Sequence, residues 1–227
     1  AYALRVDVTN SDDIKQAFTE ISQKFGRLDV LVNNAGFGMA GAIEETSLAE
    51  TRELFEANFF GALQVTQAAL PLMRTQKSGH IIQISSHGGF KAMPGFGIYN
   101  ASKFALEGFS EALAAEVAPL GIRLTIVEPG PFRTKFAGNG FRLAAKTIED
   151  YSGTAGVFRQ RIKGVDGKQE GDPQKAAEAI IGIVQAENPP LRLPLGKTAV
   201  ATITSKLESV QRDLDTYREV AQAAVYA

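Results

Sequence analysis

Three short apolar segments of this chain end in small or polar residues, and these segments constrain the fold more than any other feature. They cover residues 28–33, 81–85 and 124–127. Long segments with helical periodicity, 48–77 and 99–118, lie between them. Strands that alternate with helices of this length form βαβ units and a parallel sheet. The sequence therefore predicts an α/β fold.

The N-terminal part of the chain fits the same alternation. Residues 4–8 are predicted to form a strand, and residues 11–25 a helix. We expect Ser11 or Asp12 to cap this helix and Gly26 to end it.

The pattern lapses for about forty residues after Pro131 and then resumes. Asp172 and Pro173 are typical of a helix N-terminus. Residues 191–195 are predicted to form a last short strand. An amphipathic helix should follow, with its apolar positions at Ile203, Leu207, Val210, Leu214 and Tyr217.

Composition excludes several functions. A chain of 227 residues with 44% hydrophobic content can bury one core, so we expect residues 1–227 to form a single domain, with 199–227 as a helical extension. The net charge of −1 gives no reason to expect nucleic acid or an anionic membrane as a partner. Cysteine is absent and the only histidines are His80 and His87, so we expect no metal site. No apolar run is long enough for a membrane span, and a cytoplasmic location is the default expectation.

Tyr99 and Lys103 are spaced to share one face of a helix. A free phenol has a pKa of about 10. A nearby ammonium and the positive end of a helix both favour the phenolate. We therefore expect this pair to act as a general acid/base, although the spacing alone also occurs by chance on many helices.

The predicted strand ends add further candidates near this pair. Ser86 ends the strand before Tyr99, and the adjacent Ser85 is an alternative for the same hydroxyl role. Residues 33–36 and 128–131 follow two other strands. The carboxyl ends of parallel strands are where open α/β sheets bind ligands, so one crevice should collect these groups.

Together these residues resemble the short-chain dehydrogenase/reductase family. The matching motifs are Asn33-Asn34-Ala35-Gly36, Asn58 within 57–61, Ser86, Tyr99 with Lys103, and Pro129-Gly130. The resemblance implies a Rossmann-like, doubly wound parallel sheet with helices on both faces.

The family opens with a strand, a glycine-rich turn, a helix and a second strand, none of which precedes Ala1. We therefore expect the sequence to be part of a longer protein, with the first two strands missing. The second strand normally decides between NAD and NADP, and the family tendency weakly favours NADP.

The resemblance implies hydride transfer between a nicotinamide cofactor and an alcohol or carbonyl carbon. Tyr99 would move the proton, and Ser86 would hydrogen-bond the reacting oxygen. Lys103 would lower the pKa of Tyr99 and bind the nicotinamide ribose. Asn58 would belong to a proton relay that reaches Lys103.

Several residues are implied to contact the dinucleotide, and the alternative for each is an ordinary turn or strand end. Those implied are Asp7 and Val8 at the adenine, Asn34, Ala35 and Gly36 along the cofactor, Tyr99 and Lys103 at the ribose, Pro129, Gly130 and Phe132 at the nicotinamide, and Thr134 at the carboxamide or a phosphate.

The substrate side of the crevice is predicted to be apolar and covered by a lid, residues 132–171. Predicted substrate contacts are Ser86, His87, Met93, Phe96 and Tyr99, with Phe37, Phe90 and Pro94 nearby. A lipophilic alcohol or ketone would suit such a pocket. Basic residues in the lid would also suit coenzyme A-linked or carrier-bound substrates. The alternative is that these residues face water.

Two further expectations concern partners and turnover. The helices at 48–77 and 99–118 resemble the family's dimer contact, so we expect a homodimer or homotetramer. The alternative function is an NAD(P)-sensing binding protein without turnover, and an intact Ser86, Tyr99 and Lys103 argues against it.

Overall fold

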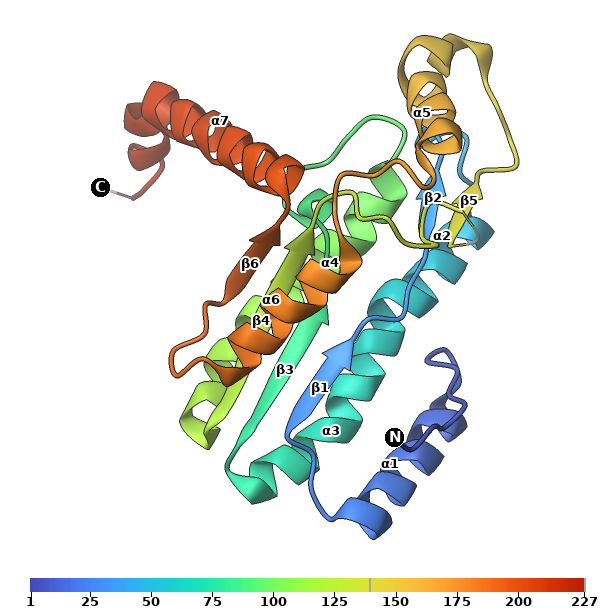
Figure 1. The fold of residues 1–227 in the computed structure, drawn as a ribbon. Coiled ribbons are helices and arrows are strands. Elements are labelled where there is room, and N and C mark those ends of the chain that lie inside the picture. Colours follow the sequence, from blue (N-terminus) through green and yellow to red (C-terminus); the bar gives the residue numbers. More distant parts are fainter. Residues whose placement is uncertain (139, 227) are drawn as a thin grey trace.

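A four-stranded parallel sheet forms the centre of the computed structural model, which describes residues 1–138 and 140–226. The strand order is β1 (Val30–Asn33), β3 (Gly79–Ile84), β4 (Ile122–Pro129) and β6 (Arg192–Leu195). All three neighbouring pairs are parallel. The predicted α/β fold with a parallel sheet is confirmed (Figure 1).

Helices cover both faces of this sheet. Helix α6 (Pro173–Gln185) lies on one face, and α3 (Ala62–Gln76) and α4 (Gly97–Val117) lie on the other, with α1 (Ser11–Phe25) beside α3 (Figure 1). The largest buried cluster joins β3 and β4 to α3 and α4. Its members are Met73, Ile81, Leu113, Val117, Ile122, Leu124 and Ile126.

The predicted helix at 48–77 consists of three consecutive pieces. Helix α2 (Leu48–Phe55) begins with a capping box between Ser47 and Glu50. A π-helical turn, η1 (Glu56–Gly61), then leads directly into α3. Such turns are common at functional sites, and this one contains Asn58.

The segment without predicted periodicity folds over the carboxyl ends of the strands. A small parallel sheet pairs β2 (Gly38–Ala40) with β5 (Phe141–Leu143). The turns η4 (Glu149–Tyr151) and η5 (Ser152–Gly156) then lead to α5 (Val157–Val165). Figure 1 shows α5 and this small sheet together, at the end of the molecule beyond the main strands.

The strand predicted at residues 4–8 does not form. A strand needs a neighbour for its backbone hydrogen bonds, and the described residues place none beside this segment. The N-terminal residues pack on α1 instead, where Tyr2 contacts Phe25 and donates a hydrogen bond to Glu20. The predicted cap of α1 is also wrong, because Asn10 accepts the hydrogen bonds from the first turn, although Gly26 ends the helix as predicted.

The C-terminal elements follow the prediction closely. Asp172 caps α6, with Pro173 at its first position. Helix α7 (Lys197–Gln222) leaves the end of β6 and extends away from the sheet (Figure 1). Within the part of the chain that the structure describes, no helix combines the length and apolarity needed to cross a bilayer.

Candidate active site

Ser86, Tyr99 and Lys103 meet in a buried site at the carboxyl end of β3. Ser86 follows β3, while Tyr99 and Lys103 lie in the first two turns of α4. Between 4% and 8% of each residue is exposed. The Ser86 hydroxyl is close enough to the Tyr99 phenol to lower its pKa, and it accepts a hydrogen bond from the backbone N–H of Gly88 at 3.0 Å.

The other serine faces a different group. The Ser85 hydroxyl lies beside Glu107 and lowers the pKa of that carboxyl, but no hydrogen bond joins them. Glu107 lies one turn beyond Lys103 on α4. Of the two serines, Ser86 is therefore the one beside the phenol.

Lys103 is fixed by the backbone of β3. Its Nζ donates to the carbonyl oxygen of Ile84 at 2.9 Å and lies 5.9 Å from the centroid of the Tyr99 ring. Burial lowers the pKa of Lys103 to about 8, and the negative charge of Glu107 opposes this shift. An ammonium has three N–H donors, so it can hydrogen-bond further groups beyond Ile84.

The expected lowering of the Tyr99 pKa is wrong for this structure. Burial raises the pKa of Tyr99 to about 12, and the nearby Ser86 hydroxyl opposes the shift only in part. The nearby cation is visible in the sequence, whereas the loss of water around the phenol is a consequence of the fold. A neutral phenol is a proton donor, which is the form that carbonyl reduction requires.

Asn58 links the π-helical turn to the segment after β1. Its Oδ1 accepts from the N–H of Phe37 at 2.9 Å, and its Nδ2 donates to the carbonyl of Phe37 at 2.9 Å and to Ser102 Oγ at 3.2 Å. The side chain is 1% exposed. Its amide therefore fixes the backbone beside Gly36, close to Lys103.

A cavity of about 740 Å³ opens in front of these groups, within the usual range for ligand pockets. The predicted cofactor residues that line it are Asn34, Gly36, Tyr99, Lys103, Pro129, Gly130, Phe132 and Thr134. Asp7, Val8 and Ala35 are not among the described lining residues. The exposed Asp7 carboxylate accepts hydrogen bonds from Thr9, and Val8 packs against Gly61.

All five predicted substrate residues line the same cavity: Ser86, His87, Met93, Phe96 and Tyr99. Phe37 lines it too, whereas Phe90 and Pro94 are absent from the described wall. His87 Nδ1 lies 3.3 Å from Thr202 Oγ1, and burial lowers the pKa of this imidazole.

Aromatic side chains from the loop before α4 and from the segment after β4 pack over Tyr99. Phe96 stacks on the Tyr99 ring with centroids 4.1 Å apart, and Phe158 of α5 packs against Phe96 at 4.8 Å. Phe136 contacts Tyr99 edge-on at 5.9 Å, and Phe141 contacts both Phe96 and Phe136. These contacts cover the phenol with apolar surface and account for its burial.

Asn100 is a site residue that the sequence analysis missed. It is 1% exposed, donates to the carbonyl of Gly88 at 2.8 Å and accepts from the N–H of Met93 at 2.9 Å. It thereby ties the loop after Ser86 to α4. The sequence offered one indication of this role, which is an amide side chain inside a predicted helix, between Tyr99 and Lys103.

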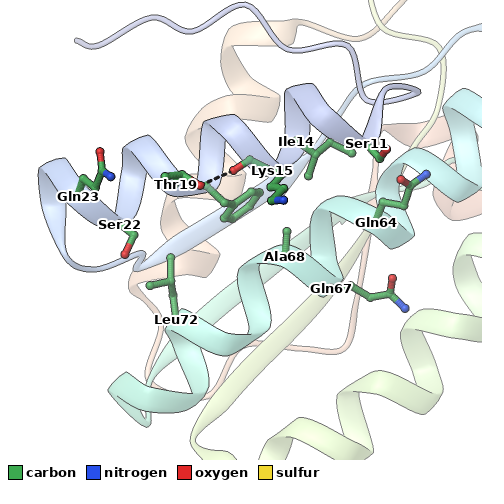
Figure 2. A pocket seen from close by; sticks show the side chains of 11 residues that line it. Ser11, Ile14, Lys15, Thr19, Ser22, Gln23, Gln64, Gln67, Ala68 and Leu72 are labelled. Atoms are coloured by element: carbon green, nitrogen blue, oxygen red, sulfur yellow. Dashed lines mark hydrogen bonds between the residues drawn. The ribbon is translucent and has the colours of Figure 1, made fainter.

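A second, more open groove of about 680 Å³ runs between α1 and α3 (Figure 2). Its wall combines polar and apolar side chains and contains none of the predicted site residues. Within the described residues, no group of three or more histidine and acidic side chains could hold a metal ion.

Comparisons with known proteins agree with this geometry. The family model of short chain dehydrogenases matches residues 1–142. A short-chain dehydrogenase structure from Streptomyces avermitilis superposes with a TM-score of 0.93 and 43% identity, covering 100% of this chain and 82% of that chain. The 3-ketodihydrosphingosine reductase of Bacteroides thetaiotaomicron is 43% identical over 196 residues, which is 85% of this chain and 72% of the reductase. The structure of ElxO with NADP bound has a TM-score of 0.69 and 26% identity, over 87% of this chain and 77% of that chain.

Proposed function

We propose that this chain, which belongs to the short-chain dehydrogenase/reductase family, transfers hydride between a nicotinamide dinucleotide and the carbonyl or alcohol carbon of a lipophilic substrate. The observation that carries the proposal is the buried contact of Ser86 with Tyr99, beside Lys103, at the wall of the 740 Å³ cavity. A sensor of dinucleotides would need no such set of proton-transferring groups.

The residues at the cavity wall fit the nicotinamide half of a dinucleotide. Gly36 and Gly130 present only backbone to the cavity, and Lys103 retains N–H donors for the ribose. Thr134 would meet the carboxamide or a phosphate. When bound, the dinucleotide supplies or accepts the hydride.

The proton is handled by the chain's own residues. In reduction, Tyr99 Oη donates its proton to the carbonyl oxygen as negative charge develops there, and Ser86 Oγ hydrogen-bonds the same oxygen. The positive charge of Lys103 stabilises the resulting phenolate. The raised pKa of Tyr99, about 12, keeps the phenol protonated before the reaction, which is the form that can donate a proton in reduction.

A lipophilic substrate is supported by the apolar part of the wall. Besides Met93 and Phe96, this wall includes Phe136, Phe141, Phe158, Ile162, Val165 and Ile180. The reductase from Bacteroides thetaiotaomicron is named for a long-chain ketone, in agreement with such a wall. We propose that residues 132–171 act as its lid, that residues 1–227 form one domain, and that NADP is preferred over NAD.

Paired substitutions test this function. Tyr99→Phe removes only the hydroxyl, so turnover of a panel of lipophilic ketones should fall by at least about 100-fold, the scale of general acid catalysis. Fluorescence titration with NADPH should give nearly unchanged affinity. Lys103→Ala should reduce both turnover and NADPH affinity, because Lys103 serves the proton and the ribose. Equal turnover in Tyr99→Phe and the parent would contradict the assignment, and NADPH binding without any turnover in the parent would favour the sensor.

A further inference from the structure

A cluster of buried charges lies behind the candidate active site. Arg192 of β6 contacts Glu107 of α4 at 3.1 Å through Nη2 and Glu128 of β4 at 3.2 Å through Nε. The Glu107 and Glu128 side chains are 6% and 0% exposed. A third carboxylate, Glu111, contacts Arg192 Nη1 at 2.9 Å from the surface, where its side chain is 54% exposed.

Each buried member of the cluster adjoins a group of the site. Glu107 lies one helical turn after Lys103, on the same face of α4. Glu128 directly precedes Pro129 and Gly130, which line the cavity. The Ser85 hydroxyl, next to Ser86, lies beside Glu107 and lowers its pKa. The cluster therefore joins α4, β4 and β6 next to residues of the cavity wall.

Close packing keeps Glu107 in this position. A Cβ atom at Gly89 would lie 2.5 Å from Ser85 Oγ and 3.1 Å from Glu107 Oε1. Real Cβ atoms do not approach so closely, so glycine at position 89 is a condition for the contact between these two side chains.

Among the described groups around Lys103, Glu107 is the carboxylate that balances its positive charge. On α4 these groups are Tyr99 and Glu107, while β3 contributes the Ile84 carbonyl and η1 contributes the neutral Asn58. Burial favours the uncharged amine, and the negative charge of Glu107 favours the ammonium.

Burial also disfavours the charged form of Glu107, so an opposite charge beside it favours ionisation. Its neighbours are Ser85, Arg192, Glu111 and Glu128. Burial raises the pKa of Glu107, while Ser85 and Arg192 oppose the shift and Glu111 adds to it. Burial and the charge of Glu107 also raise the pKa of Glu128, to about 7, with Arg192 opposing. Arg192 is thus the cation that favours the ionised form of Glu107.

We propose that Glu107, held by Arg192, is a positioning residue that keeps Lys103 in its ammonium form during turnover. The proposal rests on the proposed function, because it assumes that the charge of Lys103 is needed for the proton step and for binding the dinucleotide. Glu107 itself does not touch the reacting atoms.

The test compares two carboxylates that share Arg192, in the full-length protein. In Glu107→Gln, the alkaline limb of the pH profile of kcat/KM should move to lower pH by roughly one unit, because a charge one helical turn away is lost. The pH above which the affinity for NADPH falls, measured by fluorescence titration, should move to lower pH by the same amount. Glu111→Gln is the matched control and should leave both profiles in place, since Glu111 lies at the surface. Glu107→Asp retains the charge and should restore the parent profile in large part.

Two outcomes would overturn the proposal. The first is an alkaline limb in Glu107→Gln that coincides with that of the parent, in activity and in NADPH binding. The second is an equal shift in Glu111→Gln, which would assign the effect to the general field around Arg192. If Glu107→Gln does not fold, the double variant Glu107→Gln/Arg192→Gln takes its place, because replacing both partners of a buried ion pair costs less than removing one. The same shift to lower pH is expected, since Glu107 is the charge that acts on Lys103, and an unchanged limb counts against the proposal. Failure of the proposed function itself would appear differently, as full activity in Tyr99→Phe.

Discussion

Gly36 and Asn58 limit the size of the side chain that fits beside Lys103. A Cβ atom at Gly36 would lie 2.7 Å from Asn58 Oδ1 and 3.9 Å from Lys103 Nζ. Gly36→Ala should therefore displace the Asn58 amide and leave the N–H and carbonyl of Phe37 unpaired. We expect a loss of about 1–3 kcal/mol in the free energy of unfolding, together with lower kcat/KM.

Denaturant unfolding and steady-state kinetics measure the two effects of Gly36→Ala. The control is Gly108→Ala in α4, where no atom lies within 4 Å of the new methyl group. That change should raise the free energy of unfolding by up to about 1 kcal/mol, because alanine favours helix more than glycine does. A Gly36→Ala protein as stable and active as the parent would contradict the role given to Asn58.

Spacing along the chain was enough to locate the central residues, but not to set their pKa values. Ser86, Tyr99 and Lys103 meet as their intervals predicted. The direction of the Tyr99 pKa was predicted incorrectly, because it depends on Phe96 and Phe136, whose packing on the phenol is a tertiary contact.

Among the elements, the segment between β5 and α5 depends on one buried ion pair. Glu45 Oε2 accepts from Arg159 Nη2 at 2.8 Å and from the N–H of Ala42 at 2.7 Å, while Glu45 Oε1 accepts from the N–H of Ile148 at 2.8 Å. Arg159 also donates to the carbonyl of Lys146 at 2.8 Å. The side chains of Glu45 and Arg159 are 2% and 12% exposed. This pair attaches the proposed lid to the segment after β2.

Glu45→Gln should loosen the segment 144–165. Removing one partner of a buried ion pair leaves the other charge unpaired, at a cost of about 3–5 kcal/mol where no local rearrangement relieves it. Hydrogen exchange should show faster opening of 144–165, with little change in β3 and β4, and KM for a lipophilic ketone should rise. Glu44→Gln removes an exposed contact with Tyr151 and serves as the control.

The pH dependence of this ion pair has a definite sign. Burial alone would raise the pKa of Glu45, but hydrogen bonds from Ala42 and Ile148 and the charge of Arg159 lower it below its usual value. The stabilisation is therefore complete above the unfolded pKa, near 4.5, and is lost as pH falls through the lower folded pKa. Hydrogen exchange in 144–165 is compared between Glu45→Gln and the parent at neutral pH. If it is equally slow in both proteins, the ion pair does not attach this segment.

Local signals predicted most of the elements, and tertiary contacts account for the rest. The helix ending at Gly26 and the helix beginning at Asp172 follow from capping chemistry that the sequence displays directly. The π-helical turn containing Asn58 could not be predicted, because its apolar stripe is the same as that of an ordinary helix. The strand at 4–8 was predicted from the alternation of strands and helices and from the family resemblance, but strand formation also requires a neighbour.

For the molecule as a whole, the sheet order and the buried charges depend on pairs far apart in sequence. Arg192 meets Glu107 across 85 positions, and Thr202 meets His87 across 115. No periodicity within a single element indicates such pairs. The sequence could therefore predict that the strand ends form one crevice, but not which charged groups support it from behind.

The helical layer on one face of the sheet leads to a prediction about assembly. Phe59 of η1 packs against Phe109 of α4 with ring centroids 6.1 Å apart, so these two helical segments lie side by side. On the same segments, Phe60 and Phe104 remain 41% and 43% exposed. Exposed aromatic residues on adjacent helices are typical of protein–protein contacts. We expect this layer to pair with the same layer of a second copy, as a two-fold symmetric homodimer or as part of a homotetramer.

Light scattering at micromolar concentration tests this assembly through matched charge insertions. Phe104→Glu should reduce the mass to that of a smaller species, because a carboxylate at the centre of an apolar contact is costly to desolvate. Leu207→Glu introduces the same charge on α7, where the leucine is 55% exposed, and should leave the mass unchanged. A monomeric parent protein would refute the assembly. If Leu207→Glu alone caused dissociation, the interface would lie on α7 and not on α4.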